Sequence, residues 1–173
     1  MRAFKILILV IALFLSACAT PIPAAEMMPN PNIYNQLDTG KLTKNVSVGK
    51  VQMSDDMPKS GLVVTEEEFR LTLTNALQNA KWQNSTNAKY TLNATFVKFE
   101  QPFTLFNTKI FSVVNYELVD TKNGTVPYKQ TVKIPCVKGM GEYFDGNIRQ
   151  VQTMLCSIRE NVTHVFRDLN SKF

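Results

Sequence analysis

Histidine, cysteine and charge are scarce in this chain of 173 residues. One histidine, three cysteines and the lack of a glycine-rich phosphate-binding motif leave most hydrolase and transferase schemes without their usual general base. A formal net charge of +5 without a local basic cluster does not indicate a nucleic-acid partner. Seven glycines and eight prolines exclude a collagen-like or low-complexity chain. The 45% of hydrophobic residues is enough for one domain with a buried core.

Long apolar runs are also missing, apart from one at the N-terminus. Ile6–Leu15 is an unbroken run of ten apolar residues, preceded by Arg2 and Lys5. Ten helical residues rise about 15 Å, which is half of the roughly 30 Å of a bilayer's hydrocarbon core. The run therefore predicts an export signal and not a membrane span.

The apolar run ends in Leu15-Ser16-Ala17-Cys18, which resembles the lipobox of bacterial lipoproteins at every position. The resemblance implies that residues 1–17 are a signal peptide and that Cys18 is lipidated with fatty acids such as palmitate. Two or three acyl chains would hold the protein firmly on a membrane. Ala19 stands where inner-membrane lipoproteins of enterobacteria have Asp, so the resemblance implies the periplasmic face of the outer membrane.

The segment after the lipobox predicts a tether. Residues 18–44 contain Pro21, Pro23, Pro29 and Pro31, and they show neither helical nor strand periodicity. A flexible linker of this length would hold the body about 25–30 Å from the membrane. Residues 45–173 are then expected to form a single periplasmic domain.

The first half of this domain predicts a strand followed by a helix. Val46 to Met53 suggests a strand, and Thr65 with Glu68 matches the capping box at a helix start. Apolar residues then recur on one helical face from Phe69 to Ala80. Glu66, Glu67 and Glu68 suit the positive end of the helix dipole, and because they point in different directions they are not expected to bind one ion.

The second half predicts three strands and a long helix. Apolar and polar residues alternate over residues 90–96, 110–118 and 126–134, and Asn123-Gly124 predicts a hairpin between the last two strands. Proline and lysines on the final strand suit a sheet edge. Seven apolar residues from Ile148 to Leu169 form one stripe on the last helix. The order strand, helix, three strands, helix predicts an α+β two-layer sandwich, with a mainly antiparallel sheet of about four strands and two helices on one face.

Two cysteines remain once Cys18 is assigned to the lipid. In an oxidising periplasm Cys136 and Cys156 are expected to form a disulfide, with two buried free thiols as the alternative. His164 lies off the apolar stripe of the last helix and is interpreted as a solvated residue, without a metal site.

Two loops are candidates for binding a partner. The glycine-rich stretch 138–146 carries Tyr143 and Phe144, and the stretch 99–111 carries Phe103 and Phe106 beside a proline. Such aromatic side chains are typical anchors at protein interfaces. The alternative interpretations are a connection that brings the cysteines together and an apolar hairpin tip.

These features predict a lipoprotein without enzymatic activity, cofactor or metal, in the envelope of a bacterium with two membranes. The general outline is similar to small outer-membrane lipoproteins of unknown function. In layout it also resembles lipopolysaccharide-assembly lipoproteins and the auxiliary lipoproteins of lipid-exporting transporters. The leading hypothesis is an accessory or assembly subunit of an envelope complex, and the alternative is a carrier or sensor of an apolar ligand such as a lipid. An exposed aromatic patch would favour the first, and an apolar cavity between sheet and helices the second.

Overall fold

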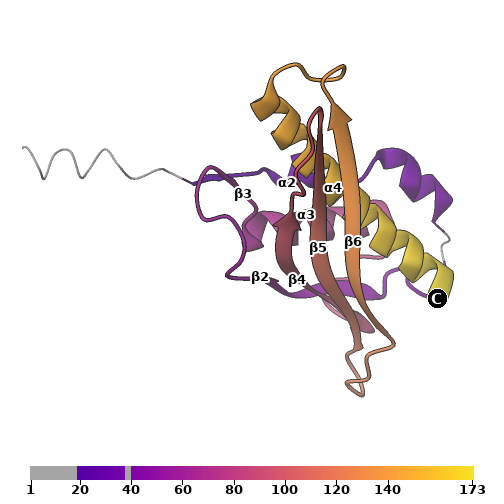
Figure 1. Ribbon diagram of the computed structural model, residues 1–173. Coiled ribbons are helices and arrows are strands. Elements are labelled where there is room, and N and C mark those ends of the chain that lie inside the picture. Colours follow the sequence, from indigo (N-terminus) through magenta and orange to yellow (C-terminus); the bar gives the residue numbers. More distant parts are fainter. Residues whose placement is uncertain (1–18, 38–39) are drawn as a thin grey trace, which may run out of the picture.

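The structure is a computed structural model that describes residues 19–37 and 40–173. The predicted signal peptide and Cys18 lie outside the described residues. Four strands form a mixed sheet in the order β2-β4-β5-β6, in which β2 runs parallel to β4 and the other neighbours are antiparallel (Figure 1). The strands are β2 (Val46–Met53), β4 (Tyr90–Glu100), β5 (Asn107–Asp120) and β6 (Tyr128–Gly139).

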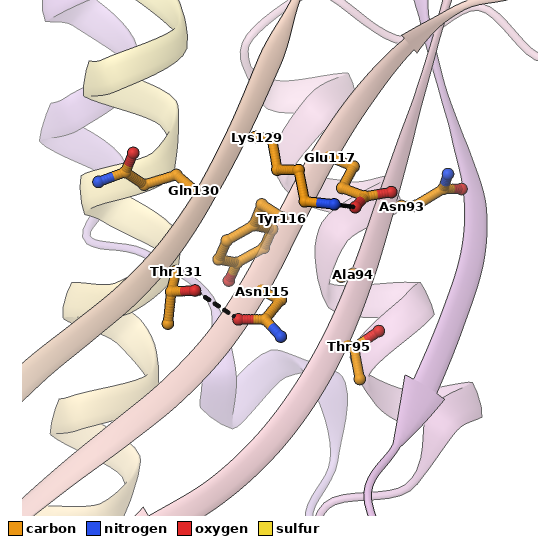
Figure 2. A pocket seen from close by; sticks show the side chains of 9 residues that line it. All are labelled: Asn93, Ala94, Thr95, Asn115, Tyr116, Glu117, Lys129, Gln130 and Thr131. Atoms are coloured by element: carbon orange, nitrogen blue, oxygen red, sulfur yellow. Dashed lines mark hydrogen bonds and ion pairs between the residues drawn. The ribbon is translucent and has the colours of Figure 1, made fainter. Parts of the chain in front are cut away.

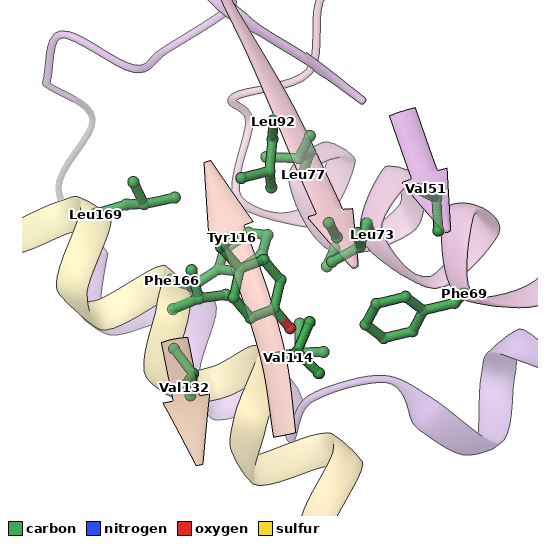
Figure 3. Close-up of a cluster of buried hydrophobic side chains, with 14 of the residues drawn as sticks. Val51, Phe69, Leu73, Leu77, Leu92, Val114, Tyr116, Val132, Phe166 and Leu169 are labelled. Atoms are coloured by element: carbon green, nitrogen blue, oxygen red, sulfur yellow. The ribbon is translucent and has the colours of Figure 1, made fainter. Parts of the chain in front are cut away.

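Two long helices cover one face of this sheet, which confirms the predicted α+β sandwich. The helix α3 (Glu66–Asn79) packs on β2, and α4 (Gly146–Lys172) packs on β5 and β6. Their side chains and those of the strands meet in a single hydrophobic cluster (Figure 3). The cluster includes Leu73 and Leu77 of α3, Phe166 and Leu169 of α4, and Leu92, Val114, Tyr116 and Val132 of the sheet.

The helix α3 begins where the capping signal predicts. The Thr65 hydroxyl accepts a hydrogen bond from the Glu68 amide at 3.2 Å, which satisfies one of the free N–H groups of the first turn. The Glu68 carboxylate does not close the capping box, because it accepts a bond from the Ala24 amide instead, at 2.7 Å. The predicted face of α3 is buried, with Phe69 and Leu73 fully removed from solvent.

The helix α4 is capped by Asp145, whose carboxylate accepts bonds from the amides of Asn147 and Ile148. Its 27 residues span about 40 Å. The stripe is buried from Leu155 to Leu169, but Ile148 is 52% exposed and the prediction that it belongs to the core is wrong. The buried stripe packs the later turns of α4 onto the sheet, and the first turn lies outside this contact.

A buried polar group joins α4 to the sheet. The Asn161 side chain is fully buried and donates to the backbone carbonyls of Ser112 and Val132, each at 3.0 Å. It also accepts a bond from the Tyr116 hydroxyl at 3.0 Å. All three bonds can form only when α4 lies at one position across the sheet. Asn161 therefore fixes the position of α4 on β5 and β6.

The segment predicted as a flexible tether is folded in its described part. It contains β1 (Thr20–Pro21), the short helix α2 (Ala24–Met27) and the 3₁₀ helix η1 (Pro31–Gln36), and β1 pairs in parallel with β3 (Leu62–Val63). The prediction is wrong for a physical reason, since the segment's apolar side chains find a place in the core. The larger buried apolar side chains are Ile22, Met27, Ile33 and Leu42.

Polar contacts hold this N-terminal segment to both helices. On the α3 side, the Thr72 hydroxyl donates to the Ala24 carbonyl at 3.3 Å, in addition to the bond between the Ala24 amide and Glu68. On the α4 side, Arg159 donates to the Glu26 carbonyl at 2.7 Å and lies 3.3 Å from the Glu26 carboxylate. The segment therefore spans the two helices on the side opposite the sheet.

The predicted hairpin between β5 and β6 is present, and β6 is an edge strand of the sheet as expected. Only Gly124 of the Asn-Gly pair has a positive φ, of +70°. Asn123 stabilises the turn differently, because its side chain accepts bonds from the amide and hydroxyl of Thr125. The strand β6 also runs further than predicted, to Gly139, and includes Pro135 and Cys136.

Candidate functional site

Exposed apolar side chains gather at one end of the sheet. The loop 101–106 joins β4 to β5, and the loop 140–145 joins β6 to α4. Because Asn107 pairs with Gly139, the two loops lie at the same end, at the top in Figure 1. We call the five side chains that are at least half exposed there the apolar apex: Phe103 (90%), Leu105 (78%), Phe106 (68%), Phe144 (86%) and Ile148 (52%).

Three of the four predicted partner-binding residues belong to the apex, and one does not. Phe103, Phe106 and Phe144 are brought together from two loops that are far apart in the sequence. Tyr143 is half-buried and instead lines a separate groove, about 500 Å³ in volume, between α4 and the N-terminal segment. The sequence missed Ile148, because its place in the apolar stripe of α4 assigned it to the core.

Polar contacts hold the loop 140–145 in place. Glu142 accepts bonds from the Lys138 ammonium at 2.6 Å and from the Gly139 amide at 3.1 Å. The Lys138 ammonium, followed by this backbone bond, holds the pKa of the Glu142 carboxyl below its usual value. Arg149 of α4 donates to the Tyr143 carbonyl and the Thr108 hydroxyl, at 2.8 and 3.1 Å. These charged groups thus make their bonds within the protein.

The Arg149 contacts also leave a hollow beside the apex. It has a volume of about 440 Å³ and lies between the loop 101–106 and the first turn of α4, with the side chains of Phe103 and Leu105 on its rim. The hollow is open to solvent. An apolar group that met the apex would find both projecting side chains and this recess.

The open face of the sheet carries a second surface of different chemistry. A hollow of about 220 Å³ is lined by polar residues of β4, β5 and β6, which Figure 2 shows. Lys129 pairs with Glu117 at 2.7 Å, and the Thr131 hydroxyl donates to the Asn115 side chain at 2.8 Å. These groups bond to each other across neighbouring strands, which suits a hydrated surface more than a catalytic centre.

The two cysteines expected to pair are joined. The Sγ atoms of Cys136 and Cys156 form a disulfide, with the Cα atoms 5.8 Å apart. The bond connects the C-terminal part of β6 to the first half of α4, so the loop 140–145 does double back as predicted. Cys156 lines the floor of the same groove as Tyr143.

Of the other residues with chemically reactive side chains, His164 and two of the three glutamates make contacts within the fold. His164 is exposed on α4, with its ring nitrogen 3.9 Å from the Asp168 carboxylate. Among the three consecutive glutamates, Glu66 accepts a bond from the Met53 amide, whereas Glu68 caps the N-terminal segment. Within residues 19–37 and 40–173 no group of three or more His, Cys, Asp or Glu side chains is placed to hold a metal ion. In the same residues, no helix has the length and apolar character that crossing a membrane requires.

Comparison with known proteins gives information on the fold of the domain. The sequence matches no known protein family and no curated protein. Protein XCC0632 from Xanthomonas campestris, of the family DUF330, superimposes with a TM-score of 0.60 at 11% identity, over 89% of this chain and 94% of that one. At this identity the similarity shows a shared fold.

Two bacterial lipoproteins are matched with lower TM-scores. A minor lipoprotein from Acinetobacter baumannii has a TM-score of 0.46 at 11% identity, over 70% of this chain and 92% of that chain. Lipoprotein GNA1162 from Neisseria meningitidis has a TM-score of 0.40 at 11% identity, over 73% and 98% of the two chains.

Proposed function

We propose that this protein is a lipid-anchored accessory or assembly subunit of a cell-envelope complex, without catalytic activity of its own. The lipobox supports the anchor at Cys18, and Ala19 supports the periplasmic face of the outer membrane as its place. The observation that carries the proposal is the apolar apex. Five large apolar side chains exposed together mark a surface by which a domain of this size contacts another component of the envelope, either a protein or the membrane.

The alternative, a carrier of an apolar ligand, has less support. A ligand pocket for a lipid would need an enclosed and mainly apolar space of several hundred Å³. In the described residues the space between sheet and helices is filled by the hydrophobic cluster, with residues such as Phe166 and Tyr116 fully buried. The hollow of about 500 Å³ beside Tyr143 is open and includes Lys138 and Glu160 in its lining.

The anchor is tested by replacing Cys18 with Ser. The parent should incorporate labelled palmitate and fractionate with membranes, and Cys18→Ser should lose the label. If Cys18→Ser still incorporates palmitate, the anchor lies elsewhere and the assignment from the lipobox is wrong.

The subunit role is tested by photo-crosslinking in intact cells. A photo-reactive phenylalanine is placed at Phe103 or Phe144 of the apex, at Thr95 of the open sheet face, and at Lys122 in the hairpin at the opposite end as the control. We expect a discrete protein adduct from the apex or the open face, and none from Lys122. If neither surface yields a protein adduct, the proposed subunit role is wrong.

A further inference from the structure

The first described residues of the chain lie close to the N-terminal part of α4, the helix that carries Ile148 of the apolar apex. The Thr20 amide donates to the Gly61 carbonyl at 2.7 Å, so the chain is bound to the body from its second described residue. Ile22 and Leu62 then share a shallow, mainly apolar hollow with Val151 of α4. Ile148 precedes Val151 by three residues, a rise of only about 4.5 Å along the helix. The N-terminal segment thus enters the fold beside the first turns of α4 (Figure 1).

The connection between anchor and body is short. Only Ala19 separates Cys18 from Thr20, and two residues span at most about 7 Å when fully extended. A long tether would let the body move freely, but the folded segment removes that freedom. If Cys18 carries the lipid, this end of the body is held against the bilayer surface.

We propose that the apolar apex inserts into the surface of the lipid bilayer that holds the anchor. This inference rests on the proposed lipidation of Cys18. Phe and Leu side chains are suited to the boundary between headgroups and acyl chains, and their transfer from water is favourable. The apex supplies Phe103, Leu105, Phe106 and Phe144, all more than two-thirds exposed.

The surroundings of the apex are compatible with this contact. Glu142 is paired with Lys138, and Arg149 is bonded to the Tyr143 carbonyl, so tip insertion breaks no ion pair. With both anchor and apex on the membrane, the body has a fixed orientation. Its open sheet face then remains available to proteins of the envelope.

The experiment uses the full lipidated protein in vesicles of phosphatidylethanolamine and phosphatidylglycerol that contain phosphatidylcholine brominated on its acyl chains. Bromine quenches tryptophan fluorescence only at close range. Phe103→Trp and Phe144→Trp report on the apex, and Lys122→Trp at the opposite end is the matched control. The native Trp82 is buried against Phe166, at the other end of α4, and the parent protein provides its background signal.

We expect several-fold stronger quenching of the two apex tryptophans than of the control. Equal quenching at all three positions would overturn the inference. Protein adducts from the apex in cells, without lipid quenching in vesicles, would assign the apex to a protein partner and leave the subunit role intact. Quenching at the apex without any protein adduct would support the membrane contact and contradict the subunit role.

Discussion

The guanidinium group of Arg159 donates a hydrogen bond of 2.7 Å to the backbone carbonyl of Glu26, 133 residues earlier in the chain. This bond ties the N-terminal segment to the middle of α4. The contact therefore holds the segment on the body, and with the proposed anchor at Cys18 it would limit how far the domain can move from the membrane.

Replacing Arg159 with Ala should loosen this attachment. The loss of a charge-assisted bond at a partly exposed site should lower the free energy of unfolding by about 1 kcal/mol. Hydrogen exchange of the amides in Ala24–Met27 should become faster, while exchange in the sheet should not change. Glu26→Gln is the matched control, because it removes the ion pair of 3.3 Å but keeps the backbone acceptor. Unchanged exchange of α2 in Arg159→Ala would show that the apolar side chains alone hold the segment.

The apolar stripe of α4 has a buried part and an exposed part, and introducing an aspartate should destabilise the fold much more in the buried part. Leu155→Asp places a carboxylate in the core and should lower the free energy of unfolding by about 4 kcal/mol or more, a large part of the roughly 5–15 kcal/mol typical of such domains. Ile148→Asp introduces the same charge about two turns away. Its side chain is already 52% exposed, so this variant should unfold at nearly the temperature of the parent. Thermal unfolding of the two variants checks this. A parent-like melting temperature for Leu155→Asp would mean that the stripe is not the core of the domain.

Local patterns predicted the elements of this fold well, because each element forms with its own capping and periodicity. Thr65 caps α3 as the sequence indicates. Burial of the N-terminal segment was not predictable, since Pro and Asn suggest a linker, and the place for Met27 exists only after both helices have packed. The same holds for Asn161, whose bonding partners come from two strands.

The candidate site was predictable residue by residue but not as a surface. Aromatic residues in polar loops marked Phe103 and Phe144 as contact residues. Their common location depends on the pairing of Asn107 with Gly139, a contact between distant parts of the chain. The exposure of Ile148 was not predicted. Periodicity shows to which face of a helix a side chain points, but not where along the helix the contact with the sheet ends.

The disulfide should contribute to stability through the loop that it closes. A bond between residues 20 apart is expected to stabilise the folded state by about 3 kcal/mol. Cys136→Ser with Cys156→Ser should therefore lower the free energy of unfolding by about that amount in urea titrations. Alkylation of the purified parent under denaturing, non-reducing conditions should modify neither cysteine. Two alkylated thiols in the mature protein would contradict the bond.

Stability should fall at alkaline pH because of Tyr116. Burial raises the pKa of its phenol well above the ordinary value of 10.0, and its hydroxyl donates to Asn161. The folded state therefore holds the phenolic proton more tightly than the unfolded chain does. The resulting stabilisation is complete below about pH 10 and is lost as the pH rises further. Tyr116→Phe should be less stable by about 1 kcal/mol at neutral pH, because the buried Asn161 oxygen loses its donor. In urea titrations it should also lose less stability than the parent between about pH 9 and pH 11. An equal alkaline loss in both proteins would show that other groups cause it.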